Sequence, residues 1–460
     1  MNLSAPAASE SEPVFTPSVG GSATERFLRV QHIIALISCV VIAISVVFAR
    51  RKLFFIPGKV PLIYFASVFT MLWGLGVFAW VLRHRRSIDI RLMLREAWAL
   101  LLYYAVSMAL LVIVLIRARF SSAILHMTFN YWVLYPAVPL AWLMGKVSGK
   151  QARKVLPVLM LTLASIGFIV SAGELLAAFG HANPIGDLIV WYNRINLPLA
   201  SWTWNHTEAL RIIGYSFDPN YFAFFALIGI IWALCGRDRI VLRLIVLAEN
   251  SFMLFFSASR GVFVTFLIVL IVWALVYRRW FGALFRGRRA SSITLIIVVV
   301  VLVAAVFSVA ARGPLSSMVS RMGSAVSAVQ KQGFTTETLD LLSNGRGALW
   351  GDALRLIQEK PLGHWLAERQ LSKISFHNDY LVMWVTGGPL LFFAFILLLV
   401  WMGRRRTPSS NRGLPLLLAL TCALTSFFYN IFQFGAVLPL VFFILGVYAQ
   451  SRGKAVATDG

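Results

Sequence analysis

The chain has 460 residues, 59% of them hydrophobic, and a formal net charge of +24 at pH 7. Its apolar runs are about 20 residues long, which is the length that a helix needs to cross a bilayer, so a soluble catalytic domain is excluded. The Lys and Arg residues gather at the ends of these runs, where the positive-inside rule and anionic lipids explain them, so we expect membrane lipids and no nucleic acid as partners.

The predicted fold is all-α, a polytopic membrane protein with about 12 transmembrane helices and a large periplasmic loop that contains short helices. In chain order we expect a disordered cytoplasmic tail at 1–27, transmembrane helices one to nine at 28–311 with a periplasmic loop at 180–219, a large periplasmic loop at 312–378, transmembrane helices ten to twelve at 379–450, and a cytoplasmic tail at 451–460. The predicted spans lie near 30–49, 60–82, 97–116, 129–144, 155–179, 220–235, 240–257, 261–277, 292–311, 379–402, 414–428 and 434–449.

The large loop shows two stretches of helical periodicity. The first covers residues 315–330, and the second covers 346–359 with Leu349, Leu354 and Ile357 as its apolar residues. We expect both helices to lie over the membrane-facing core like a lid.

Unusual polar residues gather near span ends on the predicted outer side of the membrane. They are Arg211, Asp218, Asn220, Arg260, Arg346, His377, Asn378 and Asp379. An imidazole titrates near neutrality and can remove a proton from a sugar hydroxyl, while guanidinium groups suit bidentate binding of a diphosphate. These groups are suited to a transfer reaction in which an acceptor hydroxyl attacks an anomeric carbon and a diphosphate leaves.

Four of these residues also have a purely structural interpretation. Asp218 is placed to cap the following helix, with Pro219 in its first turn. Arg211 and Arg260 are alternatively interfacial anchors, and His377 is alternatively a buried histidine with ordinary hydrogen bonds. Gly261 permits a tight turn or a close approach of the backbone to a ligand.

Motifs for metal and nucleotide binding are missing from the sequence. The first outer loop has no Asp or Glu, Cys39, Cys235 and Cys422 form no metal-like spacing, and there is no HExxH or Gly-rich phosphate loop. The sequence therefore favours a mechanism without metal or cofactor.

Several motifs in this order resemble the O-antigen ligase and polymerase superfamily of bacterial envelope proteins. They are Asp218-Pro219-Asn220, Ser259-Arg260-Gly261, Asn344-Gly345-Arg346 with Trp350, Pro361-Leu362-Gly363, and His377-Asn378-Asp379-Tyr380-Leu381 followed by Gly387-Gly388. The resemblance covers roughly residues 200–400 by these motifs, and elsewhere only the number and placement of helices.

The resemblance implies an enzyme of the bacterial inner membrane with its active site facing the periplasm. The donor would be a glycan on undecaprenyl diphosphate, and the acceptor either the lipid A core, as in an O-antigen ligase, or a growing glycan, as in a polymerase. His377 would be the general base, Arg211 and Arg260 would grip the diphosphate, and Arg346 would join them when the loop closes. Asp218, Asn220, Asn378 and Asp379 would support them.

The sequence is compatible with two alternatives. The long stretch between Arg260 and His377 leaves room for an O-antigen or exopolysaccharide polymerase in place of a ligase. A transporter or flippase of lipid-linked saccharides would instead place charges at several depths in the membrane, whereas most of the ionisable residues here gather near one face.

Overall fold

The computed structural model describes residues 21–47, 65–85, 88–117, 119, 122–178, 184, 212, 214, 218–236, 240–277, 323, 327–328, 330–331, 333, 346–364, 376–405, 413–432 and 437–449. All the regular elements in this part of the chain are helices, so the all-α polytopic fold predicted from hydropathy is confirmed. The predicted span 292–311, the predicted helix at 315–330 except for isolated residues, and most of the loop at 180–219 lie outside the described residues.

Each of the remaining predicted spans contains a helix. These helices are α1 (Gly21–Val47), α2 (Phe65–Arg83), α4 (Trp98–Arg117), α5 (Ser122–Ala178), α7 (Pro219–Cys235), α8 (Ile240–Phe256), α9 (Arg260–Val276), α15 (Asp379–Gly403), α16 (Leu414–Phe428) and α17 (Leu438–Tyr448). The long α5 holds two predicted spans, which meet at Gly149, where φ is 42° and ψ is −118°. Helix α1 begins at Gly21, inside the predicted tail, and an exposed Glu25–Arg29 pair one turn apart supports this extension.

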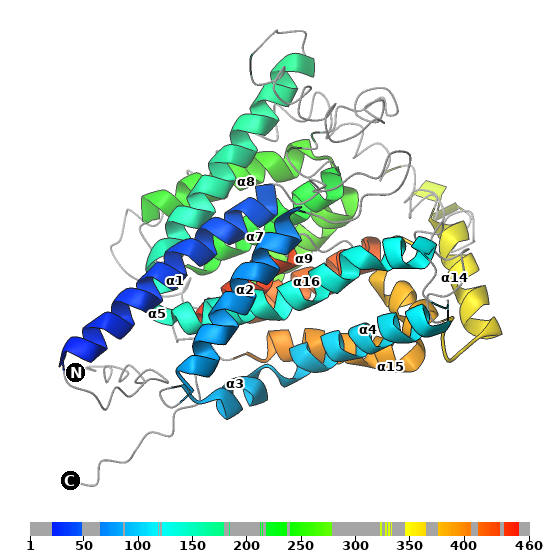
Figure 1. The fold of residues 1–460 in the computed structure, drawn as a ribbon. Helices are drawn as coiled ribbons and strands as arrows, with labels where there is room; N and C mark the ends of the chain where they lie inside the picture. The colour runs from blue at the N-terminus through cyan, green and yellow to red at the C-terminus, as the bar shows by residue number, and fades with distance from the viewer. Residues whose placement is uncertain are drawn as a thin grey trace, which may run out of the picture.

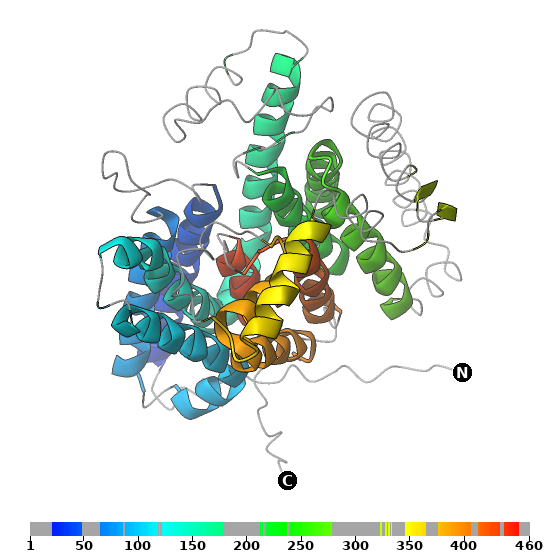
Figure 2. The ribbon, with the colours of Figure 1, turned by 90° about the vertical axis from the view of Figure 1, so that its right-hand side faces the viewer.

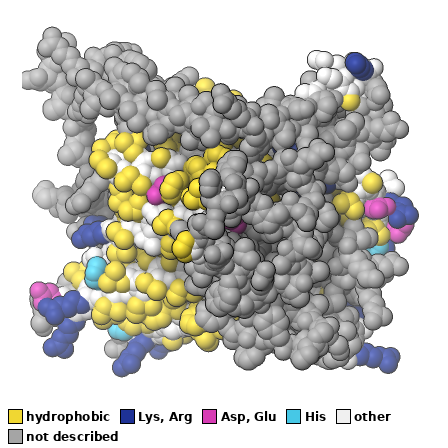
Figure 3. Space-filling view, turned by 90° about the horizontal axis from the view of Figure 1, so that it is seen from above, with side chains coloured by type: hydrophobic (Ala, Val, Ile, Leu, Met, Phe, Trp, Pro, Cys, Tyr) yellow, Lys and Arg dark blue, Asp and Glu magenta, His cyan; other side chains and the backbone are white. Residues whose placement is uncertain are grey.

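Among the described residues, four helical segments are long and apolar enough to cross a bilayer, namely Glu25–Val47, Trp98–Arg117, Tyr131–Leu176 and Asp379–Gly403, and shorter apolar helices accompany them. Large hydrophobic side chains such as Leu72, Ile116 and Phe393 are exposed on the surface. The space-filling view shows a broad hydrophobic area with Lys and Arg side chains toward its edges (Figure 3). Such a surface is suited to contact with lipid.

The core of the bundle contains α17, which is buried along its whole length and packs mainly against α5. Helices α4 and α15 run side by side, and the short amphipathic helix α14 (Gly347–Glu359) lies at one end of the molecule (Figure 1). Helix α14 confirms the second predicted loop helix. Its buried side consists of Ala353 with Leu356 and Ile357, whereas Leu354 is 53% exposed.

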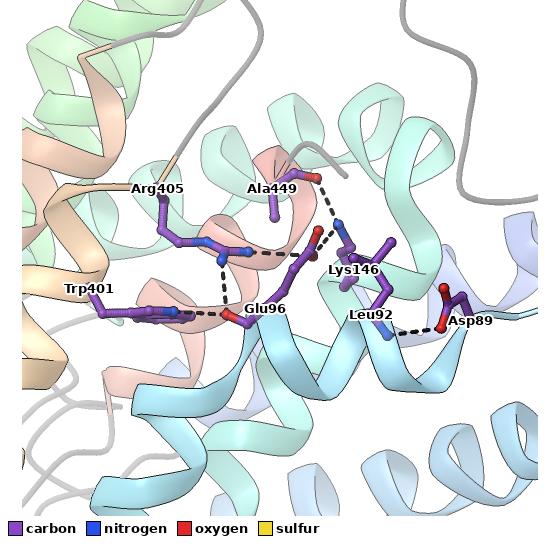
Figure 4. Close-up of polar contacts among 7 residues, drawn as sticks. All are labelled: Asp89, Leu92, Glu96, Lys146, Trp401, Arg405 and Ala449. Atoms are coloured by element: carbon purple, nitrogen blue, oxygen red, sulfur yellow. Dashed lines mark hydrogen bonds and ion pairs between the residues drawn. The ribbon is translucent and has the colours of Figure 1, made fainter. Parts of the chain in front are cut away.

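A cluster of buried charges joins the elements at the other end (Figure 4). Glu96 ends the short helix α3 (Ile90–Glu96), and its carboxylate lies 2.7 Å from Lys146 Nζ and 3.6 Å from an Arg405 nitrogen. Its backbone carbonyl accepts hydrogen bonds from Trp401 Nε1 and Arg405 Nη1. Lys146 and Arg405 lie far apart in the sequence, so the fold brings these two cations together around one carboxylate.

Candidate functional site

The described residues among those predicted for the outer side lie at the end of the bundle opposite to Glu96. Helices α7, α9 and α15 all begin there, and α8 and α16 end there. Viewed from this side, α14 lies across the ends of the bundle helices (Figure 2). Three helix N-termini at one end present backbone N–H groups and the positive ends of helix dipoles to the same region, which favours anions.

Asp218 caps α7, as its spacing predicts. Its carboxylate accepts a hydrogen bond from the backbone N–H of Asn220 at 2.7 Å, and Pro219 occupies the first turn. The Asn220 side chain in turn accepts from the Ser259 hydroxyl at 2.9 Å. Because Ser259 directly precedes Arg260, this bond ties the start of α9 to the start of α7.

The connection between α16 and α17 contributes a group of contacts that the sequence did not predict. We call residues Phe428–Phe432 the α16–α17 connection. Tyr429 places its hydroxyl 3.2 Å from Ser259 Oγ, and the carbonyl of Asn430 accepts from the Tyr221 hydroxyl at 3.1 Å. A Tyr-Asn pair that directly follows an apolar span was the available signal.

Asp379 is fully buried at the first position of α15. Its Oδ2 accepts hydrogen bonds from Ser426 Oγ at 2.9 Å and from the backbone N–H of Phe432 at 3.1 Å. The carboxylate therefore holds the α16–α17 connection against α15. The preceding residue, Asn378, caps α15 by accepting from the backbone N–H of Leu381 at 3.1 Å.

His377 has a strained backbone, with φ at 49°. A positive φ is uncommon outside glycine and, where neighbours enforce it, often marks a functional position. The neighbours on both sides are held, because Asn378 caps α15 and the carbonyl of Phe376 accepts from Trp350 Nε1 of α14 at 3.0 Å. Phe376 itself is buried with Ala353 in a small core between α14 and α15.

Burial lowers the pKa of His377 below its ordinary value of 6.5. The cation of Arg346 lowers this pKa further, and the carboxylate of Asp218 opposes both effects. The structure therefore brings His377, Arg346 and Asp218 within electrostatic reach of one another, although they lie far apart in sequence. An imidazole in these surroundings is neutral at pH 7 and able to accept a proton.

Arg346 precedes α14 and is docked onto the α16–α17 connection. Its Nη1 donates to the carbonyl of Phe428 at 2.6 Å, and its guanidinium lies 4.8 Å from the centre of the Tyr429 ring. Its place beside the start of α15 is thus defined by contacts within the protein.

Backbone contacts between two glycines join the end of α14 to α15. Gly388, with φ at 63° and ψ at −160°, interrupts α15, and the Leu362-Gly363 backbone packs against it. A Cβ on Gly363 would lie 2.5 Å from the nitrogen of Gly388. His364 completes the contact, because its N–H donates to the carbonyl of Val385 at 2.7 Å.

The other predicted residues are placed as follows. Arg260 is partly buried at the first turn of α9. Arg211 lies outside the described residues, but the next residue, Ile212, donates its N–H to the carbonyl of Phe256 at the end of α8. Among the described residues, no group of three or more His, Cys, Asp and Glu side chains is arranged to hold a metal ion.

Comparison with known proteins adds one finding. No curated protein matches the chain. Residues 244–396 match the family model described as O-antigen ligase, and this stretch includes Arg260, Arg346, His377 and Asp379. Through this region the chain is similar to the O-antigen ligase and polymerase superfamily of membrane proteins.

Proposed function

We propose that the protein is a glycosyltransferase of the bacterial inner membrane, which transfers a glycan from undecaprenyl diphosphate to an acceptor hydroxyl at the periplasmic face. The preferred form is an O-antigen ligase that uses the lipid A core as acceptor. The observation that carries the proposal is the meeting of His377 with Arg346 and Asp218 at the starts of three helices. The family match implies lipid-linked glycan and acceptor substrates of the same general kind.

The chemistry follows from the protonation of His377. Its lowered pKa leaves the imidazole neutral at pH 7, so it can accept the proton of the acceptor hydroxyl. The hydroxyl oxygen forms a bond to the anomeric carbon while the bond from that carbon to the diphosphate oxygen breaks. The proton ends on the imidazole and the electron pair on the leaving diphosphate, so the step is balanced without a further reactant.

The leaving diphosphate gains negative charge, which cations can stabilise. Arg260 begins α9 and Arg346 precedes α14 at the same end of the bundle, and Arg211 is proposed to join them. Fixed donors that stabilise developing charge often accelerate an enzyme reaction more than any other single effect. We propose that these groups supply this stabilisation without a metal ion, with Asp218, Asn220, Asn378 and Asp379 fixing the helix starts around them.

Reconstitution tests the proposal directly. The purified protein is placed in liposomes with an undecaprenyl-diphosphate glycan, with and without lipid A core, in the presence of a metal chelator. We expect the glycan to appear on the core. Longer lipid-linked glycans without core would instead establish a polymerase, and no product with an authentic donor would favour a transporter.

Two variants locate the chemistry in the same assay. We expect His377→Ala to reduce the transfer rate by about 10²–10⁴-fold, which is the usual contribution of a general base. Arg260→Lys keeps the charge but loses the planar fork, so transfer should also fall. His84→Ala, at the end of α2, is the matched control and should keep wild-type activity. Wild-type rates in both site variants would contradict the proposed site.

A further inference from the structure

Tyr429 contacts Arg346 through its ring and Ser259 through its hydroxyl. The ring lies under the guanidinium of Arg346 at 4.8 Å. The hydroxyl lies 3.2 Å from Ser259 Oγ, and the whole side chain is only 6% exposed. A buried tyrosine of this kind is a rigid block with two distinct contact surfaces.

The hydroxyl contact has a defined direction. Ser259 has a single hydroxyl proton and donates it to Asn220 Oδ1 at 2.9 Å. The Tyr429 hydroxyl therefore donates to Ser259, and the chain of bonds runs from Tyr429 through Ser259 to Asn220. It connects the α16–α17 connection to the first residues of α9 and α7.

Gly261 shows that the same connection also packs tightly on α9. A Cβ at this position would lie 2.8 Å from the Cβ of Phe428 and 3.1 Å from Cε2 of Tyr429. Only glycine fits such an approach without a shift of the neighbours. Tyr429 and Phe428 therefore set the position of the helical turn that bears Arg260.

We propose that Tyr429 is a positioning residue that fixes Arg346 and the Arg260-bearing turn of α9 relative to each other, so that both guanidinium groups act on one diphosphate. The inference rests on the proposed function, because that function supplies the diphosphate. It assigns to the ring the placement of Arg346 and to the hydroxyl the placement of α9. The two roles predict different losses in different variants.

The hydroxyl role is tested by a double-mutant cycle. Tyr429→Phe keeps the ring and removes the bond to Ser259, and Ser259→Ala removes the acceptor of that bond. We expect Tyr429→Phe to lower kcat/KM for transfer by about tenfold, as for loss of one buried hydrogen bond, and Ser259→Ala to lower it at least as much, because this change also removes the bond to Asn220. The double variant should lose little more than Ser259→Ala alone, since that change already removes the interaction with Tyr429. Fully additive losses would refute the hydroxyl role.

The ring role is tested by the pH dependence of the rate. The charged groups at this end of the described bundle include Asp218 before α7, Arg260 in α9, Arg346 before α14 and Asp379 in α15. Arg346 and Asp218 are the ones that shift the pKa of His377. If the ring holds Arg346 near His377, Tyr429→Leu should release this cation and raise the pKa of His377. The acid limb of the rate profile should then move to higher pH, as it should in Arg346→Gln, and should stay in place in Tyr429→Phe.

A merely structural tyrosine would lower activity without moving this limb. Tyr448 provides the matched control, because it is also buried with a cation, Arg153, 5.7 Å from its ring centre. It lies at the far end of the 11-residue helix α17, roughly 16 Å along the axis. Tyr448→Leu should therefore leave the acid limb unchanged. An equal shift in this variant, or no shift in Tyr429→Leu, would refute the ring role.

A second readout does not depend on transfer. NMR titration of histidine-labelled protein gives the pKa of His377 directly, with His377→Ala identifying its signal. We expect Tyr429→Leu and Arg346→Gln to raise this pKa together.

If the wild type makes no transfer product but these shifts occur, the proposed function fails and the ring role stands. If transfer occurs and neither the pKa nor kcat/KM responds to Tyr429, the positioning role fails and the function stands. If Tyr429→Leu does not fold, Tyr429→Phe and Ser259→Ala decide through the cycle.

Discussion

His377 lies between charges of opposite sign that belong to different helices. Arg346 and burial favour its neutral form, while Asp218 favours its protonated form. A general base works when it is neutral, so the balance of these effects sets the lowest pH at which the proposed reaction proceeds. Because Asp218 also caps α7, the same carboxylate has a structural role and an electrostatic one.

Asp218→Asn separates these two roles. An asparagine oxygen can still accept from the N–H of Asn220, so the cap persists while the negative charge is removed. The imidazolium of His377 then loses a stabilising partner and its pKa falls. We expect the acid limb of the transfer rate to move to lower pH, opposite to the direction in Arg346→Gln. A shift of both variants in the same direction in rate profiles at constant ionic strength would contradict this account.

At the scale of elements, the position of His377 depends on how α14 is fixed to α15. Trp350 holds the carbonyl of Phe376, and the Leu362-Gly363 backbone packs into the break of α15 at Gly388. The two contacts lie on either side of a small core around Ala353. The helix and the segment before His377 therefore form one packed unit.

Gly388→Ala tests this unit. Gly388 combines φ of 63° with ψ of −160°, a conformation restricted almost entirely to glycine, and an added Cβ would overlap the carbonyl of Leu362. We expect a stability loss of about 1–3 kcal/mol, measured as a lower midpoint of thermal unfolding in detergent. Transfer activity should fall as well. The control Gly351→Ala lies in α14 with open space around it and should raise stability slightly. Equal midpoints for the two variants would contradict the packing described.

Hydropathy predicted the helices well, because each long apolar run must satisfy its backbone within one span. The Asp218 cap also followed from a local pattern and is confirmed. At Gly261 the sequence suggested a turn or a ligand, whereas the close neighbours are the side chains of Phe428 and Tyr429. The contacts of Tyr429 did not follow from a local pattern, because its partners Ser259 and Arg346 lie far away in sequence and hydropathy does not register a single hydroxyl. Of the apolar residues predicted in α14, Ile357 packs against the core around Ala353 and Leu354 is 53% exposed, because helical periodicity gives an apolar stripe but not which of its edges packs.

At the scale of the molecule, the two ends of the bundle differ in how their charged side chains are arranged. At the site, charged groups surround a histidine that is only partly buried. At the opposite end, Glu96, Lys146 and Arg405 form a closed cluster, and the paired side chains of Glu96 and Lys146 are 9% and 6% exposed. Helix α15 extends from one end to the other, beginning at Asp379 and ending beside Arg405. The Glu96 cluster therefore anchors the helix whose other end positions His377.

Removing the shared anion tests this anchoring. Glu96→Gln leaves Lys146 and Arg405 buried without a carboxylate between them, and loss of one partner from a buried ion pair costs about 3–5 kcal/mol. We expect a lower unfolding midpoint, partly restored in Glu96→Gln with Lys146→Met, since the second change removes one uncompensated cation. Glu25→Gln breaks only the exposed pair with Arg29 and should change nothing measurable. If Glu96→Gln unfolds at the wild-type temperature, the Glu96 carboxylate contributes no net stability, and the end of α15 must be held by other contacts, such as the bonds from Trp401 and Arg405 to the backbone carbonyl of residue 96.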